Sequence, residues 1–329
     1  MALPLGKRAD LLIREDSPFN AGPSPKQMNA GVITPTDRFF VRNHGDIPQI
    51  SPDDYRLSIG GMVAHPLELS LPDLRGFPEH RLISTLQCAG NRRDELAEIA
   101  PIPNELPWSA GAISNATWGG ARLRDILLAA GVKSEAQHAT FKGLDEVARH
   151  GAIFGFGGSI PVEKALHPDT LLAYEMNGRP LTAAHGFPLR VVVPGYIGAR
   201  SVKWVSDIRL QETPSDNYFQ ARAYRLFPPD VTPENVRWEN GIMLGENTIN
   251  SVMGVDIDSM IPYPNVNGQA AHGGYCGTAV KPIALNMVSE LARDAEFNIP
   301  ISGIGGITTW RDAVEFMLLG ARTVQVCTA

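Results

Sequence analysis

The chain has 329 residues, of which 43% are hydrophobic and 19% charged, and a formal net charge of −6. That length is sufficient to bury one large hydrophobic core or two smaller ones. The mildly acidic balance and the absence of a Lys/Arg tract exclude general nucleic-acid binding, and no apolar stretch is long enough for a membrane span.

The first thirty residues are rich in Pro, Gly and Asn and are expected to form an extended arm over the body of the protein. They lack the apolar segment of a secretory signal, so we expect a cytoplasmic protein. A twin-arginine signal removed before Met1 would instead place it in the periplasm. Three cysteines (Cys88, Cys276 and Cys327) provide neither a disulfide framework nor a CxxC zinc pattern.

From about residue 34 to residue 210, short strands and short helices alternate without a regular βαβ rhythm, which predicts an α+β fold. An amphipathic helix is expected over 120–131, closed by Gly131. Asn177-Gly178 is a strong hairpin-turn signal. The expected strands lie at 56–59, 171–176, 189–193 and 201–210.

The most informative stretch is Ser84-Thr85-Leu86-Gln87-Cys88-Ala89-Gly90-Asn91-Arg92-Arg93. Cys88 ends a predicted strand, and the Gly-Asn turn is expected to bring two guanidiniums close behind its thiol. Their charges favour the thiolate, which ligates metals or attacks electrophiles, and they attract an oxyanion to the same place. The alternative is a buried cysteine followed by a solvated basic turn.

The pattern changes at about Leu244, so we expect two domains, 1–244 and 245–329. The second region predicts a helix from about Pro282 to Asp294 and another over 309–319, where Thr309 and Asp312 form a capping box. Strands are expected at 300–303 and 323–326. Strand, helix and strand at this spacing form a parallel crossover unit, as in α/β barrels.

Six runs of the first region resemble the molybdenum-cofactor domain of the sulfite oxidase family, and they occur in that family's order. The runs are 34–44, 84–93, 111–118, 185–190, 198–204 and 218–224. The resemblance implies a sulfite-oxidase-type α+β domain that binds molybdopterin.

The resemblance also implies roles for individual residues. Cys88 would be the thiolate ligand of molybdenum, whose other ligands are a pterin dithiolene and oxo groups. Arg42 and Arg93 would hold a sulfite-like oxyanion, and Tyr224 would hydrogen-bond a metal oxygen and assist proton transfer. The positions implied to hold the pterin are Asn43, His44, Asp145, His185, Arg190, Ser201, Val202 and Lys203. Each also has a purely structural interpretation; His185, for example, could satisfy a turn.

The activity implied is the oxidation of sulfite to sulfate by oxo transfer, with the redox chemistry supplied by the cofactor. Neither a cytochrome b5-like haem domain nor the family's immunoglobulin-like dimerisation domain is expected in this sequence. Electrons are therefore expected to pass to an external acceptor, cytochrome c or oxygen. Family members without the dimerisation domain reduce oxidised methionine or act on other small substrates.

Four runs of the second region resemble the C-terminal end of the flavin barrel of dihydropyrimidine and dihydroorotate dehydrogenases. They are 247–251, 273–282, 301–307 and 324–329. The residues implied to surround the FMN phosphate are Gly277, Gly305, Gly306, Cys327 and Thr328, and those implied to face a pyrimidine are Asn247 and Thr248. The match covers about the last third of a barrel and lacks that family's catalytic loop. A partial barrel leaves open sheet edges, so poor autonomous stability is predicted.

Three functions follow from these patterns. The first is a molybdenum-pterin oxidoreductase acting on sulfite, which predicts bound molybdenum. The second is a non-catalytic or chimeric fusion, which predicts bound pterin without turnover. The third is an FMN-dependent pyrimidine enzyme, which predicts flavin absorbance and is disfavoured by the missing catalytic segment.

Overall fold

The computed structural model describes residues 4–98, 101–102, 105–149, 151–228, 231–232 and 235–246 of the first part of the chain, and 254–255, 262–263, 265–266, 269–270, 281–293, 299–307 and 309–325 of the rest. The chain divides into two units, Met1–Asn247 and Thr248–Ala329. None of the helices in these described ranges combines the length and apolar character needed to cross a membrane.

The N-terminal arm folds into a small hairpin between two 3-10 helices, η1 (Pro4–Gly6) and η2 (Pro25–Ala30). Its strands are β1 (Leu12–Glu15) and β2 (Asn20–Gly22), which pair antiparallel. Ala21 forms a bridge with Val41 of the body, and Asn20 and Ala21 are fully buried. The arm therefore supplies part of the interior.

One sheet of the first unit has the strand order β10-β7-β14-β3-β4. Its members are β3 (Leu57–Gly61), β4 (Leu67–Leu69), β7 (His138–Gly143), β10 (Gly157–Pro161) and β14 (Val205–Gln211). β14 and β3 run parallel and the other neighbours antiparallel. β14 begins at Val205, later than the predicted residue 201, because residues 201–204 form part of a cavity wall instead.

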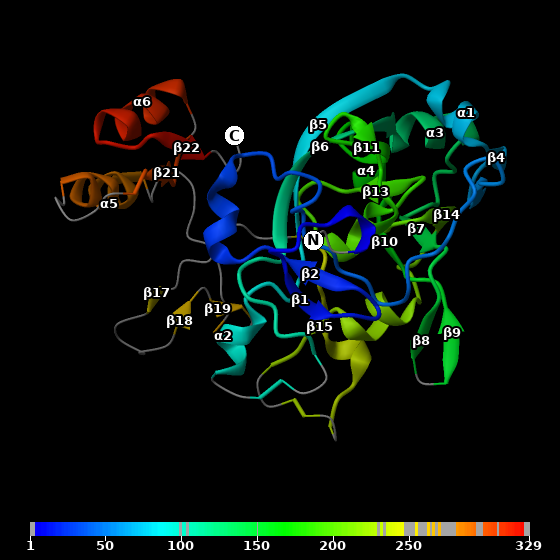
Figure 1. The fold of residues 1–329 in the computed structure, drawn as a ribbon, viewed down its shortest axis with the longest axis horizontal. Coiled ribbons are helices and arrows are strands. Elements are labelled where there is room, and N and C mark those ends of the chain that lie inside the picture. The colour runs from blue at the N-terminus through cyan, green and yellow to red at the C-terminus, as the bar shows by residue number, and fades with distance from the viewer. Residues whose placement is uncertain are drawn as a thin grey trace. The chain divides into compact units, whose positions relative to one another are not determined.

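The second sheet has the order β12-β11-β6-β5, with β13 also paired to β11. Its strands are β5 (Glu79–Gln87), β6 (Ile113–Arg122), β11 (Leu171–Met176), β12 (Arg179–Pro180) and β13 (Arg190–Val192). β5 and β6 lie side by side along their length (Figure 1), in a register that runs from Glu79↔Ala121 to Gln87↔Ile113. The predicted Asn177-Gly178 turn between β11 and β12 is confirmed, since both residues have positive φ, 53° and 73°.

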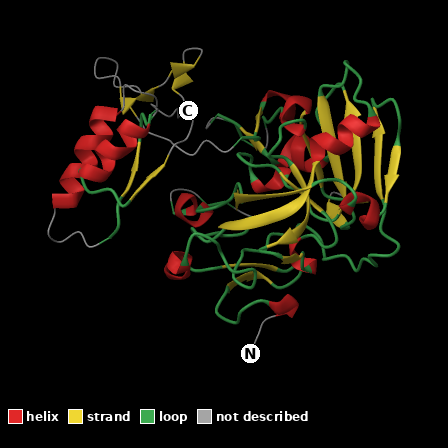
Figure 2. Cartoon of the chain, turned by 90° about the horizontal axis from the view of Figure 1, so that it is seen from above, coloured by secondary structure: helices red, strands yellow, loops and turns green. Residues whose placement is uncertain are grey.

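None of the α-helices described in the first unit has more than eight residues (Figure 2). They are α1 (Leu71–Arg75), α2 (Arg93–Ala97), α3 (Leu123–Ala130) and α4 (Val162–Ala165), with 3-10 turns η3 (Ala183–His185), η4 (Gly198–Arg200) and η6 (Trp238–Asn240) and a π-helical turn η5 (Phe219–Ala223). The two remaining hairpins join β8 (Val147–Arg149) to β9 (Ala152–Phe154) and β15 (Arg225–Leu226) to β16 (Ile242–Met243).

Helix α3 begins at Leu123, three residues later than predicted. The preceding residues still belong to β6, where Gly120 pairs with Ala173 of β11. Residues 123, 126, 127 and 130 of the helix are buried, which is the spacing of one helical face. Gly131 closes the helix with a φ of 69°, as predicted.

Two apolar clusters fill the first unit. One includes Leu57, Ile59 and Phe141 of the first sheet with Leu123 and Ile126 of α3. The other lies against the second sheet and contains Phe39, Trp108, Trp118, Leu171 and Met176. Cys88 belongs to this second cluster, so its thiol lies where β5 leaves the core.

The described part of the second unit contains α5 (Lys281–Arg293), β21 (Ser302–Ile304), α6 (Trp310–Leu318) and β22 (Thr323–Gln325). β21 and β22 pair parallel, so the predicted crossover unit is confirmed. The Thr309/Asp312 capping box is also confirmed. Two small hairpins pair β17 (Gly254–Val255) with β18 (Pro262–Tyr263) and β19 (Asn265–Val266) with β20 (Gln269–Ala270).

Candidate active site

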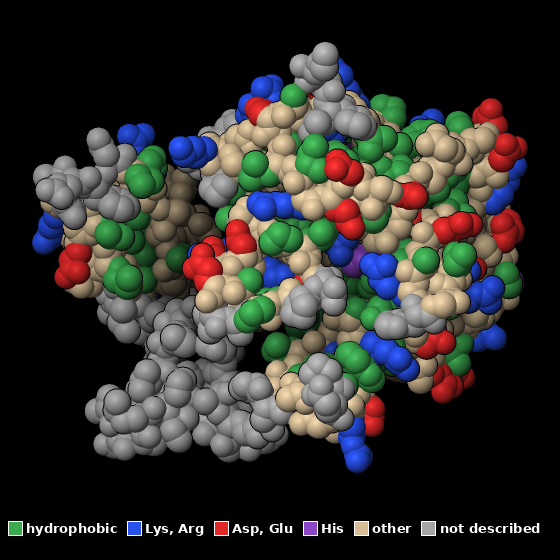
Figure 3. Space-filling model, turned by 60° about the horizontal axis from the view of Figure 1, so that its bottom comes forward, with side chains coloured by type: hydrophobic (Ala, Val, Ile, Leu, Met, Phe, Trp, Pro, Cys, Tyr) green, Lys and Arg blue, Asp and Glu red, His purple; other side chains and the backbone are tan. Residues whose placement is uncertain are grey.

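A cavity of about 710 Å³, including its open mouth, lies in the first unit. In the space-filling view, Lys and Arg side chains gather around a hollow in which a histidine is visible (Figure 3). The predicted site residues that line the cavity are Arg42, Asn43, His44, Cys88, Asp145, His185, Arg190, Ser201, Val202, Lys203 and Tyr224. Of the predicted set, Arg93 does not line it.

Cys88 follows the last residue of β5, so the predicted strand before the thiol is confirmed. Its backbone N–H donates to the carbonyl of Ala112 at 2.9 Å, and the N–H of Gly90 lies 3.4 Å from its sulfur. A side chain at residue 90 would collide with a guanidinium, because an ideal Cβ there would lie 2.4 Å from Nη2 of Arg93. Gly90 therefore leaves room for the Arg93 guanidinium beside the turn that follows Cys88.

The two arginines after Cys88 differ in their surroundings. Arg93 is largely buried; its Nη1 donates to the carbonyl of Leu106 at 2.9 Å and lies 3.1 Å from Glu105. Arg92 is exposed and pairs with Glu95 at 2.7 Å on the surface. The expectation of two guanidiniums behind the thiol is therefore wrong for Arg92, whose side chain is drawn to a surface carboxylate.

Arg42, His44 and Tyr224 form a hydrogen-bonded series on one wall. Nη2 of Arg42 lies 3.1 Å from Nδ1 of His44, and Nε2 of His44 lies 2.9 Å from the hydroxyl of Tyr224. Burial, together with the charge of Arg42, lowers the pKa of His44 well below its ordinary value, so the ring is neutral. A guanidinium can only donate, so Nδ1 accepts and Nε2–H donates to Tyr224.

That arrangement determines the role of the Tyr224 proton. The phenol oxygen accepts from His44, so its own O–H is available to an acceptor in the cavity. Burial raises the pKa of Tyr224 to about 12, which keeps the phenol protonated near neutral pH. The His44 ring stacks on Phe156 with centroids 5.1 Å apart and contacts Phe219 at 4.1 Å. Aromatic packing thus holds the imidazole in place.

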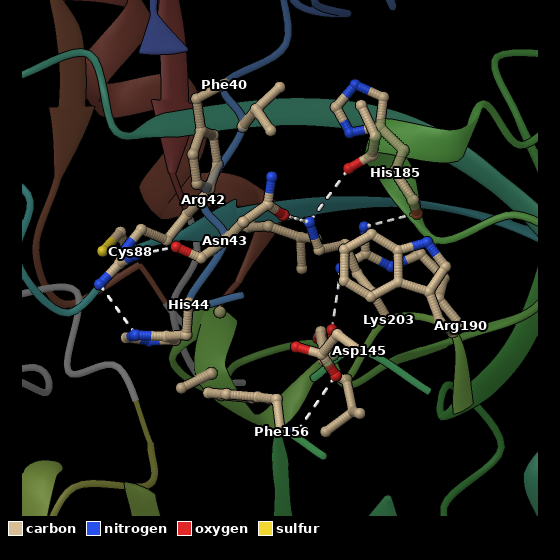
Figure 4. A pocket seen from close by; sticks show the side chains of 18 of the residues that line it. Phe40, Arg42, Asn43, His44, Cys88, Asp145, Phe156, His185, Arg190 and Lys203 are labelled. Atoms are coloured by element: carbon tan, nitrogen blue, oxygen red, sulfur yellow. Dashed lines mark hydrogen bonds between the residues drawn. The ribbon is translucent and has the colours of Figure 1, made fainter. Parts of the chain in front are cut away.

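Buried cations form another wall (Figure 4). Arg190 donates to the carbonyls of His185 and Ser201 at 3.1 and 2.9 Å, and burial lowers its pKa to about 9. Lys203 donates to the side chain of Asn43 and to the carbonyl of Ala184. Burial lowers the pKa of Lys203 well below its ordinary value, and the charge of Arg190 acts in the same direction.

Asp145 is the acidic residue among those that line the cavity. It is buried, and its Oδ1 accepts from the N–H of Phe156 at 3.1 Å. Burial raises the pKa of this carboxyl, although the Phe156 hydrogen bond and the charge of Lys203 act in the opposite direction. One carboxylate therefore faces several cations.

The charges of this cavity suit an anionic ligand. Among the described residues, none of Arg42, Arg190 and Lys203 forms an ion pair within 4 Å of a carboxylate oxygen. Buried cations are costly unless a negative partner compensates them. The thiol of Cys88 adds one soft donor, of the kind that binds thiophilic metals. The residues present therefore fit an anionic cofactor that carries such a metal.

Lys7 and Arg200 are buried basic residues that our sequence analysis did not assign to the site. Lys7 is 2% exposed and contacts the cavity residue His185. Arg200 is 1% exposed, and its Nη2 donates to the carbonyl of Leu244, whose N–H donates to the carbonyl of Tyr224. Arg200 lies within a run already identified, whereas no local pattern distinguishes Lys7 from a surface lysine.

The predicted FMN residues of the second unit are mostly outside the described ranges. Gly305 and Gly306 are described and have positive φ, 124° and 66°. Gly277, Cys327, Thr328, Asn247 and Thr248 lie outside the described residues. The flavin site therefore stays a prediction.

Comparison with known proteins gives two family matches. Residues 44–219 match the oxidoreductase molybdopterin binding domain, and residues 229–329 match dihydroorotate dehydrogenase. The second match begins within the first structural unit, ahead of the predicted boundary after residue 244.

The similar proteins include sulfite oxidases, a nitrate reductase of Ulva prolifera and a sulfane dehydrogenase. Mitochondrial sulfite oxidase of Mus musculus is 40% identical over 312 residues, which cover 92% of this chain and 53% of that protein. Sulfite oxidase of Arabidopsis thaliana is 35% identical over 293 residues, covering 85% of this chain and 74% of that protein. The crystal structure of the sulfane dehydrogenase SoxCD from Paracoccus pantotrophus aligns with a TM-score of 0.57 and 30% identity, over 67% of this chain and 54% of that one. The chain thus spans about half the length of the mouse relative.

Proposed function

We propose that this chain, which belongs to the sulfite oxidase family of molybdopterin-binding oxidoreductases, is a molybdenum-dependent enzyme that oxidises sulfite to sulfate. The observation that carries the proposal is that one soft thiol, Cys88, and three basic side chains without an ion pair among the described residues, Arg42, Arg190 and Lys203, line a single cavity. An anionic pterin would neutralise those cations, and a thiolate would complete the ligands of its metal.

We assign Cys88 to the metal and the opposite wall to the pterin. Arg190 and Lys203 supply positive charge, while Asn43, His44, His185 and Asp145 supply polar contacts. Ser201 and Val202 line the same wall. When bound, the molybdenum cofactor supplies oxygen-atom transfer and takes up two electrons.

The protein's own groups attract and orient the substrate anion. Arg42 lines the cavity, with its guanidinium oriented by hydrogen bonds to the Asn43 carbonyl and His44. Arg93 lies outside the cavity lining, near enough for its charge to lower the pKa of His44. We assign both arginines to holding sulfite. Arg42 would contact the anion within the cavity, and Arg93, which does not line the cavity, would attract it by its charge.

Tyr224 is assigned to proton handling. Its O–H is available to an anionic oxygen because His44 occupies the phenol oxygen from the other side. Overall, sulfite and one water yield sulfate, two protons and two electrons. We propose that the electrons leave to an external acceptor, cytochrome c or oxygen, and that the protein acts in the cytoplasm.

The test is to express the chain in cells that make the molybdenum cofactor and to measure its molybdenum content. Sulfite-dependent reduction of ferricyanide and of cytochrome c is then followed. Cys88→Ser should lower turnover by roughly 100-fold or more, as expected for loss of a metal ligand. Cys276→Ser is the matched control and should retain turnover. Molybdenum-loaded protein without sulfite turnover would refute the function, and protein without molybdenum would refute the cofactor.

A second candidate function is favoured only by the match of residues 229–329 to dihydroorotate dehydrogenase. It is FMN binding by the second unit. Flavin absorbance in the purified chain would support it, whereas a full chain that retains no flavin after incubation with FMN and gel filtration would exclude it.

A further inference from the structure

We propose that Lys7 of the N-terminal arm is a positioning residue for the pterin, because it determines which ring nitrogen of His185 carries the proton. The inference rests on the proposed function, since it takes the ligand of the cavity to be a molybdenum pterin. It gives the N-terminal arm, which the sequence predicted only as an extended segment over the body of the protein, a role in the site.

The contacts of the Lys7 ammonium group carry the first step. The side chain is 2% exposed, and its Nζ donates to the carbonyls of Thr36 at 2.6 Å and Phe39 at 3.0 Å. Its third neighbour is Nε2 of His185. Burial lowers the pKa of Lys7 to about 7, so below that pH the group is an ammonium, and these three neighbours then use all three of its hydrogens. Nε2 of His185 must then accept.

The state of His185 follows from that contact. The ring is buried against Phe39, with centroids 5.2 Å apart, and is surrounded by the cations Lys7, Lys203 and Arg190. Burial and these charges lower the pKa of His185 well below its ordinary value, so the ring is neutral. A neutral imidazole whose Nε2 accepts carries its hydrogen on Nδ1. His185 lines the cavity and its ring also hydrogen-bonds the backbone of Thr36, so the position of its proton determines how the ring is held beside the pterin.

Lys7 reaches this position because the arm is fixed to the cavity wall at a second place. Oδ1 of Asn20 accepts from the N–H of Asn43 at 2.7 Å, and Nδ2 of Asn20 donates to the Asn43 carbonyl at 3.1 Å. Nδ2 of Asn43 in turn donates to the carbonyl of Phe19 at 2.8 Å. Asn43 lies beside the buried Lys203 in the cavity (Figure 4). The arm therefore contacts the site through both Lys7 and Asn20.

The first measurement is made at about pH 6, below the pKa of Lys7, on cofactor-free full chain labelled with ¹⁵N-histidine, which contains eight histidines. Long-range ¹H–¹⁵N correlation spectra report the tautomer of each ring, and His185→Gln identifies the signal of interest. We expect the Nδ1–H form in the wild type. Lys7→Met removes the donor, so the ring should shift to the Nε2–H form or to a mixture. Lys26→Met, an exposed lysine of the same arm, should leave the spectrum unchanged.

The second measurement is the pterin and molybdenum retained per chain after expression in cofactor-competent cells and gel filtration. Lys7→Met should retain roughly 10-fold less, the usual effect of removing a partner that orients a ligating group, and Lys26→Met should match the wild type. A wild-type Nε2–H ring, or a folded Lys7→Met chain with unchanged tautomer and retention, would overturn the proposal. If Lys7→Met does not fold, as judged by circular dichroism, the wild-type tautomer decides. Normal pterin retention without sulfite turnover would refute the proposed function and leave the role of Lys7 standing.

Discussion

The two units of this chain differ in how much apolar surface they bury. The first encloses three tryptophans that are at most 2% exposed, Trp108, Trp118 and Trp204. The cluster of the described second unit has four buried members, Val288, Ile307, Phe316 and Ala321. A cavity with fixed walls needs close-packed surroundings, and the first unit provides them.

The described second unit leaves large apolar side chains exposed. Trp310 and Leu318 of α6 are 72% and 81% exposed, and Ile299 before β21 is 69% exposed. In a complete barrel, such residues would be covered by neighbouring strands and helices. The comparison teaches that correct local structure, here a capped helix and a parallel strand pair, does not by itself provide a core.

The largest expected effect comes from deleting one buried aromatic ring in each unit. Trp118→Ala should destabilise the first unit by about 3–5 kcal/mol and lower pterin retention, because Arg190 lies 4.8 Å from that ring. Phe316→Ala removes the largest member of the small cluster, so α5 and α6 should lose hydrogen-exchange protection while sulfite turnover persists. Loss of turnover in Phe316→Ala would show that the units depend on each other.

A drop in pH should lower the free energy of unfolding of the first unit more than that of the second. Its His44 and His185 have pKa values held well below the ordinary value, chiefly by burial. The unfolded chain takes up protons on these rings near pH 6.5 and the folded chain does not, so the contribution of the two histidines to stability is full above that pH and falls as the pH drops. At about pH 5.5 two such rings cost about 3 kcal/mol.

Chemical denaturation of cofactor-free protein, once above pH 6.5 and once at about pH 5.5, measures this loss of unfolding free energy. The described second unit contains no histidine, so its exchange protection should change less between the two conditions. His65→Gln, at an exposed position, is the control and should preserve the difference. Equal stability of the first unit at both pH values would contradict the neutral, buried state of the two rings.

Tyr224→Phe should separate chemistry from packing within the first unit. The variant keeps the ring but loses the hydroxyl that lies 2.9 Å from His44. We expect a fall in kcat of roughly 100-fold, the low end of what a positioned proton donor contributes, with little change in the unfolding midpoint. Stopped-flow reduction by sulfite measures the effect. Unchanged kcat would remove Tyr224 from the proposed chemistry.

The smallest effect compares the two arginines after Cys88. Arg93→Gln should raise the KM for sulfite by several-fold, because it removes a cation near the thiol. Arg92→Gln should change neither KM nor the unfolding midpoint, since its partner Glu95 is on the surface. Steady-state assays of both variants decide, and equal effects would mean that both charges act on the substrate.

Much of the fold could be predicted from local patterns. The turn at Asn177-Gly178, the end of α3 at Gly131 and the capping box at Thr309 depend on backbone preferences of single residues. The start of α3 was missed because Gly120 pairs with Ala173, a contact fifty residues away that no local pattern reveals. The boundary after residue 244 stays a prediction.

The site, too, could be predicted only where a local sequence pattern identifies the residue. Residues within ordered motifs, such as Cys88 and Tyr224, line the cavity as expected. Lys7 was missed because its burial depends on the docking of the arm through Asn20. Arg92 was misplaced because a surface carboxylate competes for its guanidinium. These outcomes depend on tertiary partners.

The cavity also has a consequence for biosynthesis. Groups that shape it come from residue 7 at one end and from residue 224 at the other. A ribosome that has released only half of this chain has produced no complete binding surface. Domains of this size fold as units once their sequence has emerged. Insertion of the metal group must therefore be a late maturation step on a nearly finished polypeptide.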